Sequence, residues 1–351
     1  MALTPEQAAA AFVGDGARCV PYAGGHINAS FLVQCGGPRR FLQRINGDVF
    51  PDPQQVMATV AAVTAHVRAV TGAVTVPALL QTLDGRPWLE DEAGEIWRCT
   101  EFVDGIMRAS VASAAEAFNA AFAFGAFARA LSSYQGPELP ETIPGFHDTA
   151  ARVAQLEAVS SADPVGRLSA SRREVDELLG RRALASVLPP RIASGQVPRR
   201  LAHNDAKVAN VLFDRTTGRA SWVVDLDTVM PGSLLHDFGD LVRSSVSRAP
   251  EDAADNVAEA ALFEGLAAGF VQGTGDILTP AERELLETAG RLITYEQAVR
   301  FLVDHLQGDT YYRISRPGQN LDRARAQLTL LRSLEGQTAM FTAVVARVAR
   351  S

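Results

Sequence analysis

Short, strand-like runs of apolar and polar residues fill the first part of the chain, up to about residue 102. Gly-Gly, Gly-Pro and Asp-Gly turns separate some of them, and their length and alternation are typical of β-strands. Valines spaced three and four residues apart predict one helix over residues 53–70, beginning at prolines that a first turn tolerates. We therefore expect a small sheet with one helix, with strands at residues 18–23, 30–35, 41–45, 74–81, 87–90 and 95–102.

Helical spacing dominates after residue 104. The exception is a pair of strand-like runs at residues 210–214 and 220–225, which flank a turn and predict a hairpin. We therefore predict an α+β protein with an N-terminal lobe over residues 1–102 and a larger helical lobe over residues 103–351. The helices are expected at residues 113–134, 147–160, 172–187, 251–272, 280–306 and 322–350.

The composition excludes several classes of partner. The chain has 33 Lys and Arg against 40 Asp and Glu, a net charge of −7, and no cluster of cations. Nucleic acids and anionic membrane surfaces are bound by such clusters, so we expect neither as a partner. The longest apolar stretch, residues 113–134, is interrupted by polar and charged residues, which argues against a membrane span.

The ends and the cysteines indicate the compartment. The N-terminal segment has no basic region followed by an apolar one, so we expect no secretion signal. Three cysteines without a C-x-x-C pair predict neither a disulfide framework nor a zinc site. These features predict a soluble, cytoplasmic protein.

The chemically informative residues surround the predicted hairpin. Asp205, Lys207 and Asn210 come directly before its first strand, and Asp225 ends its second strand. If Asp214 pairs with Arg219 across the turn, Asn210 lies opposite Val223, one diagonal step from Asp225. Diagonal neighbours are about 7–8 Å apart at the backbone, so their side-chain oxygens can converge on one cation at about 2.0–2.1 Å, a distance typical of Mg²⁺.

These residue types supply the parts of a phosphoryl transfer. Asp205 can accept the proton of an attacking hydroxyl, and Lys207 can face the transferred phosphate. Asp227 lies on the same strand face as Asp225 and is either a second ligand or a residue that orients the loop. Taken alone, an Asp or Asn in a loop is usually a turn or cap residue. The whole pattern, His-x-Asp-x-Lys-x-x-Asn before a hairpin, matches the kinase catalytic loop in order and spacing.

The sequence also resembles a known family over residues 19 to about 330. Its motifs include Ile27-Asn28, Asp237-Phe-Gly-Asp240 and the segments at residues 41–46, 49–53, 224–232 and 300–309. They are similar to the aminoglycoside phosphotransferase and choline kinase family, and within it to the N-acetylhexosamine 1-kinase branch. The resemblance implies a two-lobed, protein-kinase-like fold. It also implies ATP- and Mg²⁺-dependent phosphorylation of the anomeric hydroxyl of N-acetylglucosamine or N-acetylgalactosamine.

The resemblance assigns roles to individual residues. It makes Asp205 the base and Asn210 and Asp225 the metal ligands. Gly24 and Gly25 become the tight turn over the phosphates, where missing side chains let backbone N–H groups approach. The segment 99–103 becomes the hinge strand, in which Glu101 and Val103 bind adenine through their backbone. The acceptor residues expected from it are His26, Asp205, Asp227, Arg300 and Tyr311.

Two features depart from protein kinases or leave alternatives open. The third strand has no lysine but offers Gln43 and Arg44, and the helix after it contains no glutamate. Arg44 either holds the α- and β-phosphates as a bidentate fork or is a solvated surface residue. For the acceptor, His26 is otherwise a solvated loop residue, Arg300 an internal ion pair with Glu296, and Tyr311 an ordinary core aromatic.

Other functions remain as alternatives to a sugar kinase. A kinase of an amino alcohol or an aminoglycoside would need an acidic or aromatic-lined pocket for its cationic acceptor. A pseudokinase that binds nucleotide and regulates a partner would have no need of the base at Asp205. We expect Asp237 and Asp240 to be structural, capping or bracing the catalytic loop, and His203 to hold that loop in place.

Overall fold

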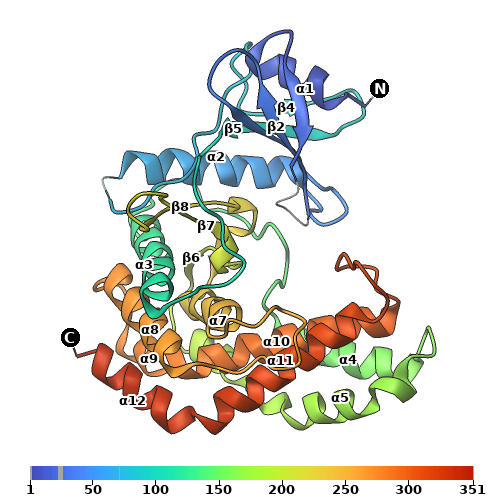
Figure 1. The fold of residues 1–351 in the computed structure, drawn as a ribbon, viewed down its shortest axis with the longest axis vertical. Helices are drawn as coiled ribbons and strands as arrows, with labels where there is room; N and C mark the ends of the chain where they lie inside the picture. The colour runs from blue at the N-terminus through green and yellow to red at the C-terminus, as the bar shows by residue number, and fades with distance from the viewer. Residues whose placement is uncertain (1, 23–26, 71, 351) are drawn as a thin grey trace.

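The computed structural model describes residues 2–22, 27–70 and 72–350. Within these residues, a five-stranded antiparallel sheet lies at one end of the molecule and a bundle of helices at the other, with helix α2 between the sheet and a small hairpin (Figure 1). The sheet order is β1-β2-β3-β5-β4. The strands are β1 (Arg18–Pro21), β2 (Ala29–Gln34), β3 (Arg40–Arg44), β4 (Leu89–Glu90) and β5 (Ile96–Glu101).

Helix α1 (Pro5–Val13) covers the outer face of this sheet and was not predicted. Phe12 packs there against Leu42 of β3 and Trp97 of β5 in a small apolar core. The start of the helix carries a capping box, in which the side chains of Thr4 and Gln7 bond each other's backbone N–H groups. That pattern, Thr-x-x-Gln before apolar residues, was a readable signal in the sequence.

The predicted helix at residues 53–70 is confirmed as α2 (Pro53–Ala69), and the predicted strand at residues 74–81 is wrong. Asp52 caps α2 by accepting the N–H of Gln55 at 2.9 Å. The segment after α2 makes only isolated bridges, with Thr75 beside Trp222. Pro77 has no N–H to give to a ladder, which explains why the pairing does not continue.

The helical lobe contains the predicted hairpin and a second strand pair that the sequence did not indicate. β7 (Val211–Phe213) and β8 (Ala220–Val223) form the hairpin. β6 (Arg200–Ala202) pairs with β9 (Met230–Gly232). The short 3-10 turns η2 (Val208–Asn210) and η3 (Leu226–Thr228) follow β6 and β8, respectively.

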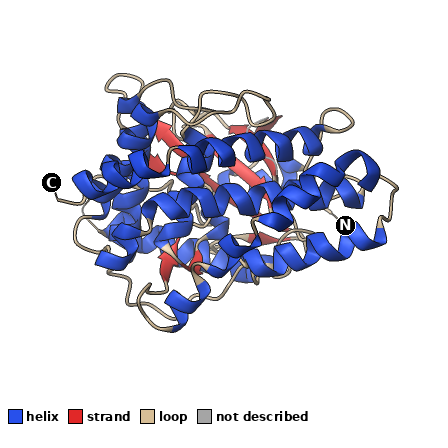
Figure 2. Cartoon of the chain, turned by 90° about the horizontal axis from the view of Figure 1, so that it is seen from below, coloured by secondary structure: helices blue, strands red, loops and turns tan. Residues whose placement is uncertain are grey.

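Most predicted helices are present, with corrected limits. The segment at residues 251–259 is not helical, helix α7 was missed, and turns at Leu285 and Gln337 divide two predicted helices. Helices α10 and α11 pack against each other. Seen from below, helices cover most of this side of the molecule, with strands visible behind them (Figure 2). The helices are α3 (Ala114–Leu131), α4 (Thr149–Ala162), α5 (Leu168–Gly180), α6 (Pro189–Ala193), α7 (Leu234–Ser245), α8 (Ala260–Thr274), α9 (Pro280–Glu284), α10 (Leu286–Gln307), α11 (Gln319–Gly336) and α12 (Thr338–Val348), with the 3-10 turn η1 (Arg182–Ser186).

Helices α3 and α8 approach unusually closely because α8 presents glycines to α3. A Cβ atom built at Gly269 would collide with the carbonyl oxygen of Phe118, and one at Gly265 with that of Ala114. The α3–α8 pair belongs to the large apolar core that extends from α2 to α12. Within the described residues, no helix combines the length and apolar character that crossing a membrane requires.

Candidate active site

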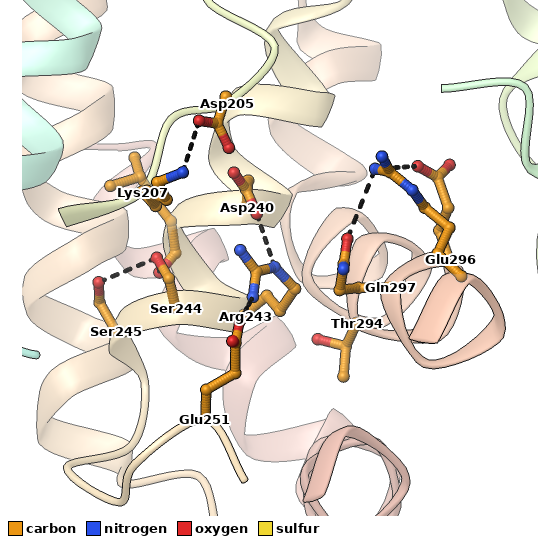
Figure 3. A network of polar contacts seen from close by, with 12 residues as sticks. Asp205, Lys207, Asp240, Arg243, Ser244, Ser245, Glu251, Thr294, Glu296 and Gln297 are labelled. Atoms are coloured by element: carbon orange, nitrogen blue, oxygen red, sulfur yellow. Dashed lines mark hydrogen bonds and ion pairs between the residues drawn. The ribbon is translucent and has the colours of Figure 1, made fainter. Parts of the chain in front are cut away.

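The structure brings Asp205, Lys207 and Asn210 together in the loop between β6 and β7. Lys207 Nζ lies 2.7 Å from Asp205 Oδ2 (Figure 3). Asn210 Nδ2 donates to the same carboxylate oxygen at 2.9 Å and to the Asp205 carbonyl at 2.9 Å. Because the amide nitrogen of Asn210 is engaged in this way, its Oδ1 is the atom left for a cation.

The charges of this loop keep Asp205 and Lys207 ionised. Burial alone would raise the pKa of Asp205, but the charge and hydrogen bond of Lys207 lower that pKa below its usual value. Burial would likewise lower the pKa of Lys207, but the carboxylates of Asp205 and Asp225 raise it. Asp205 is therefore an unprotonated carboxylate that can accept a proton at neutral pH.

Helix α7 braces the loop between β6 and β7 through hydrogen bonds to its backbone. The carboxylate of Asp237 accepts the backbone N–H groups of His203 at 2.9 Å and Asn204 at 2.7 Å. His203 is buried, and its Nε2 lies 3.0 Å from the carbonyl of Val224. The structure thus confirms that Asp237 and His203 hold the loop.

The hairpin places Asp225 beside Asn210 in a register that differs by one residue from the predicted one. Asp214 N–H does donate to the Arg219 carbonyl, at 2.8 Å. An extra residue in β8, Ser221, between the pairs Leu212–Trp222 and Phe213–Ala220 then shifts the ladder, so Val211 rather than Asn210 lies opposite Val223. The backbone carbonyl of Asn210 accepts the N–H of Val224 at 3.0 Å, one residue before Asp225.

The position and environment of Asp225 suit a carboxylate that binds a cation. Its backbone has a φ of 63°, a left-handed conformation that Asp tolerates better than most residues. Its side chain remains accessible to solvent, yet the surrounding protein and the nearby Asp227 carboxylate raise its pKa to about 6. No group of three or more His, Cys, Asp or Glu side chains in the described part of the chain could hold a metal by itself. Asn210 and Asp225 would therefore need oxygens from a nucleotide and water to complete a Mg²⁺ site.

Asp227 is buried, and its carboxylate accepts hydrogen bonds from the N-terminal lobe. Its two carboxylate oxygens accept hydrogen bonds from the guanidinium of Arg98 on β5. Asn28 Nδ2 donates to Asp227 Oδ2 at 2.7 Å. The structure therefore engages Asp227 in a contact between the lobes. The sequence reasoning missed Arg98, although a charged residue between Trp97 and Cys99 was a signal.

Arg44 lies apart from this group. Side chains alternate along a strand, so Arg44 shares the outer face of β3 with Leu42, which packs against α1. Its guanidinium lies 5.8 Å from the ring centre of Trp97 and 3.7 Å from Glu95. Of the two alternatives for Arg44, the structure favours the partly exposed surface residue.

The predicted hinge residues lie in the segment that leaves β5. Glu101 Oε1 accepts hydrogen bonds from Arg68 at 2.8 Å and from the N–H of Ala78 at 2.7 Å. The carbonyl of Val103 accepts the N–H of Gly105 at 3.0 Å. The glycine loop and the histidine predicted to contact phosphate and acceptor, Gly24, Gly25 and His26, lie outside the described residues.

The Arg300 side chain on α10 is mostly buried and makes only long polar contacts with other described residues. Its guanidinium stacks 4.8 Å from the ring centre of Phe146 and lies 3.5 Å from Gln297 and 4.0 Å from Glu296. The closer partner of Glu296 is His147, at 2.8 Å. The ion pair with Glu296 thus exists, but it does not use all N–H donors of the Arg300 guanidinium, which retains donors for another molecule.

Tyr311 is not a core aromatic, because 52% of its surface is exposed. The loop that carries it wraps around Asp304, whose Oδ1 accepts the Tyr311 N–H at 2.8 Å. The neighbouring Tyr312 is the more enclosed ring, and its hydroxyl accepts a hydrogen bond from Gln297 at 3.0 Å.

A second cation, Arg243 on α7, lies near Asp205 and was missed by the sequence reasoning. Figure 3 shows the Asp240 side chain between Asp205 and Arg243, and Asp240 Oδ1 lies 2.6 Å from Arg243 Nε. Glu251 lies 3.3 Å from the same guanidinium. Of these two carboxylates, Asp237 braces the loop backbone, whereas Asp240 pairs with Arg243.

These features define a protein-kinase-like fold, with an antiparallel sheet in one lobe, a helical second lobe and a catalytic loop before a hairpin. The chain belongs to the phosphotransferase enzyme family, whose sequence model matches residues 18–270, more than half of its length.

Solved structures share the fold over nearly the whole chain. An aminoglycoside phosphotransferase from Alicyclobacillus acidocaldarius is 15% identical with a TM-score of 0.65, over 100% of this chain and 98% of the other. A microcompartment-associated aminopropanol kinase is 17% identical with a TM-score of 0.61, over 96% and 97%. A choline/ethanolamine kinase family protein from Mesorhizobium loti is 17% identical with a TM-score of 0.54, over 95% and 93%.

Proposed function

We propose that this protein is an ATP-dependent kinase that phosphorylates a hydroxyl group of a small molecule. The observation that supports this most is the convergence of Asp205, Lys207 and Asn210 at one carboxylate, directly before the hairpin that carries Asp225. Asp205 takes the proton of the attacking hydroxyl, and Lys207 stabilises the negative charge of the transferred phosphoryl group.

The residues present fit a magnesium ion. Asn210 Oδ1 and the Asp225 carboxylate would hold it, because the amide nitrogen of Asn210 is engaged and Asp225 is accessible beside a second, fully paired carboxylate. When bound, the ion offsets the charge of the nucleotide phosphates. Nucleotide binding itself is part of the proposal, with the backbone of Glu101 and Val103 facing adenine and Gly24 and Gly25 turning over the phosphates.

The charges near the base favour a neutral acceptor. The charge of Asp205 contributes to raising the pKa of both Arg243 and Arg300, so we take both guanidinium groups to lie within electrostatic reach of the approaching hydroxyl. The carboxylates closest to them, Asp240 and Glu296, are already paired with Arg243 and His147. A cationic amino alcohol or aminoglycoside would meet like charges there, and the accessible carboxylate of Asp225 is the one proposed to hold Mg²⁺.

We therefore propose a sugar as the acceptor, and among sugars an N-acetylhexosamine, as the motifs of the sequence imply. Arg300 retains N–H donors that suit a hydroxyl or an acetamide carbonyl, and Tyr311 is the second acceptor contact that we expect from the helical lobe. His26 is the further contact that the glycine loop would supply. The anomeric hydroxyl is more acidic than an ordinary alcohol, which suits a base such as Asp205 whose pKa is lowered.

A kinase of a cationic acceptor is the second candidate, because one solved structure with this fold is an aminopropanol kinase and because Tyr311 is exposed enough to stack on a cation. The test is an ADP-release screen over N-acetylglucosamine, N-acetylgalactosamine, glucosamine, galactose, choline and an aminoglycoside. Preferred turnover of the two N-acetylhexosamines supports the proposal. Preferred turnover of choline or the aminoglycoside would replace it by the second candidate.

A further inference from the structure

The inner face of the N-terminal sheet carries a polar row where a kinase would carry its third-strand lysine. Ser30, Gln43 and Arg98 lie directly opposite one another on β2, β3 and β5. Gln43 Nε2 donates to Ser30 Oγ at 3.1 Å, and Gln43 Oε1 accepts from Arg98 Nε at 3.0 Å and Nη2 at 2.8 Å. The positive charge of this face therefore sits on β5, and β3 only orients it.

Arg98 carries that charge across to the helical lobe. Only 4% of Arg98 and 1% of Asp227 is exposed. Both terminal nitrogens of Arg98 donate to the Asp227 carboxylate, and Asn28 donates to it from the segment before β2. All three nitrogens of the guanidinium thus have an acceptor, so the arginine is held in one orientation.

The partner of Arg98 is part of the turn that positions the proposed metal ligand. Asp227 lies in η3, two residues after Asp225, and its carbonyl accepts the Thr142 hydroxyl at 2.8 Å. Asp225 itself has the left-handed φ of 63°, so its direction depends on how the turn is held. Helix α2 packs against η3 but contains no Asp or Glu that could pair with a basic side chain of the sheet.

We propose that Arg98 is a positioning residue of the phosphoryl transfer. Its ion pair with Asp227 connects the N-terminal sheet to the η3 turn and thereby fixes the orientation in which Asp225 would bind the metal. It takes the structural place of the lysine–glutamate pair of protein kinases, which this chain lacks, with the cation on β5 and the acid in the metal-binding turn. The inference rests on the proposed nucleotide and Mg²⁺ binding, and it is independent of which acceptor is phosphorylated.

The test measures ADP binding by isothermal titration calorimetry with and without Mg²⁺, so it needs no acceptor and no turnover. The variants are Arg98→Lys, which keeps the charge but loses the fork, and the double variant Arg98→Gln/Asp227→Asn, which replaces the ion pair by two amides. Arg86→Gln is the matched control, because the Arg86–Asp84 pair lies in the same lobe but is 52% and 61% exposed. Circular dichroism and thermal melting confirm that each variant is folded.

We expect the double variant to bind MgADP at least about 10-fold more weakly, the range seen when outer-shell partners of metal ligands are removed, with Mg²⁺-free binding unchanged. Arg98→Lys should show a smaller loss, and in turnover assays KM for ATP should rise while KM for the acceptor stays constant. Wild-type MgADP affinity in the folded double variant would overturn the proposal and leave the pair a purely structural one. If the double variant does not fold, Arg98→Lys decides: wild-type MgADP affinity in it overturns the proposal, and a selective loss with Mg²⁺ supports it.

Discussion

Replacing Asp205 by asparagine separates proton transfer from the architecture of the catalytic loop. Asp205 Oδ2 receives Lys207 Nζ at 2.7 Å and Asn210 Nδ2 at 2.9 Å, and an amide oxygen can accept both contacts. The change therefore removes the charge and the basicity while it keeps the shape. The two side chains of the ion pair are 24% and 31% exposed, so we expect a loss of about 1 kcal/mol or less in the free energy of unfolding.

The kinetic effect should be far larger than the effect on stability. A positioned general base contributes about 10²- to 10⁴-fold in rate, which corresponds to about 3 to 5 kcal/mol of activation free energy. We expect kcat of Asp205→Asn to fall by that factor in an ADP-release assay, with MgADP affinity within about threefold of wild type. Asp104→Asn, at an exposed ion pair with Arg39, is the control and should retain full turnover.

A turnover of Asp205→Asn within tenfold of wild type would refute this reasoning. In that case the hydroxyl would lose its proton without help from this carboxylate, and the loop would serve only to bind the metal and the phosphates.

Further predictions concern the metal, the helix packing and pH. Asp225→Ala should abolish the Mg²⁺ dependence of ADP binding by calorimetry, and a variant that keeps it would show that the hairpin does not hold the ion. Gly269→Ala should lower the free energy of unfolding by about 1–3 kcal/mol in urea titrations, because the new Cβ would meet the backbone of α3. The control Gly180→Ala, where the Cβ would point into open space, should not lower it. Equal stabilities of the two variants would contradict the close α3–α8 contact. His147→Gln should destabilise by about 3–5 kcal/mol near pH 5.5, because it removes a buried ion pair with Glu296. Burial would lower the pKa of His147, but Glu296 raises that pKa above 6.5. The stabilisation from His147 is therefore complete below pH 6.5 and is lost as pH rises through the raised pKa. Burial would raise the pKa of Glu296, but His147 lowers that pKa from 4.5 to about 2, so the stabilisation from Glu296 is lost as pH falls through about 2. Urea titrations from pH 4 to 9 should therefore show the gap between wild type and His147→Gln narrowing at alkaline pH, and a constant gap would exclude an ionised pair.

The catalytic loop and its hairpin were predictable because local spacing determines them. Asp205, Lys207 and Asn210 lie within six residues of one another, so a single loop brings them together whatever surrounds it. The hairpin followed from two short apolar runs around a turn. Its register was predicted one residue out, because an irregularity between Leu212 and Phe213 leaves no mark in the pattern of the sequence.

The contacts between distant segments were not predictable in the same way. The pairing of β6 with β9 and the ion pair of Arg98 with Asp227 join residues that are far apart along the chain. Arg44 illustrates the limit: alternation shows that it faces opposite to Gln43, but only the position of α1 shows which face is the outer one. Helix α7, in contrast, was a missed local signal, because Leu234, Phe238 and Leu241 have helical spacing directly after the capping residue Ser233.

The site of phosphorylation tests the account most directly. After incubation with ATP, Mg²⁺ and N-acetylglucosamine or N-acetylgalactosamine, ³¹P NMR of the product should show a phosphorus coupled to the anomeric proton, and Asp205→Asn should yield about 10²- to 10⁴-fold less of it in the same time. A product phosphorylated at carbon 6, or phosphate transfer to choline or an aminoglycoside but to neither sugar, would contradict a neutral acceptor whose anomeric hydroxyl faces Asp205.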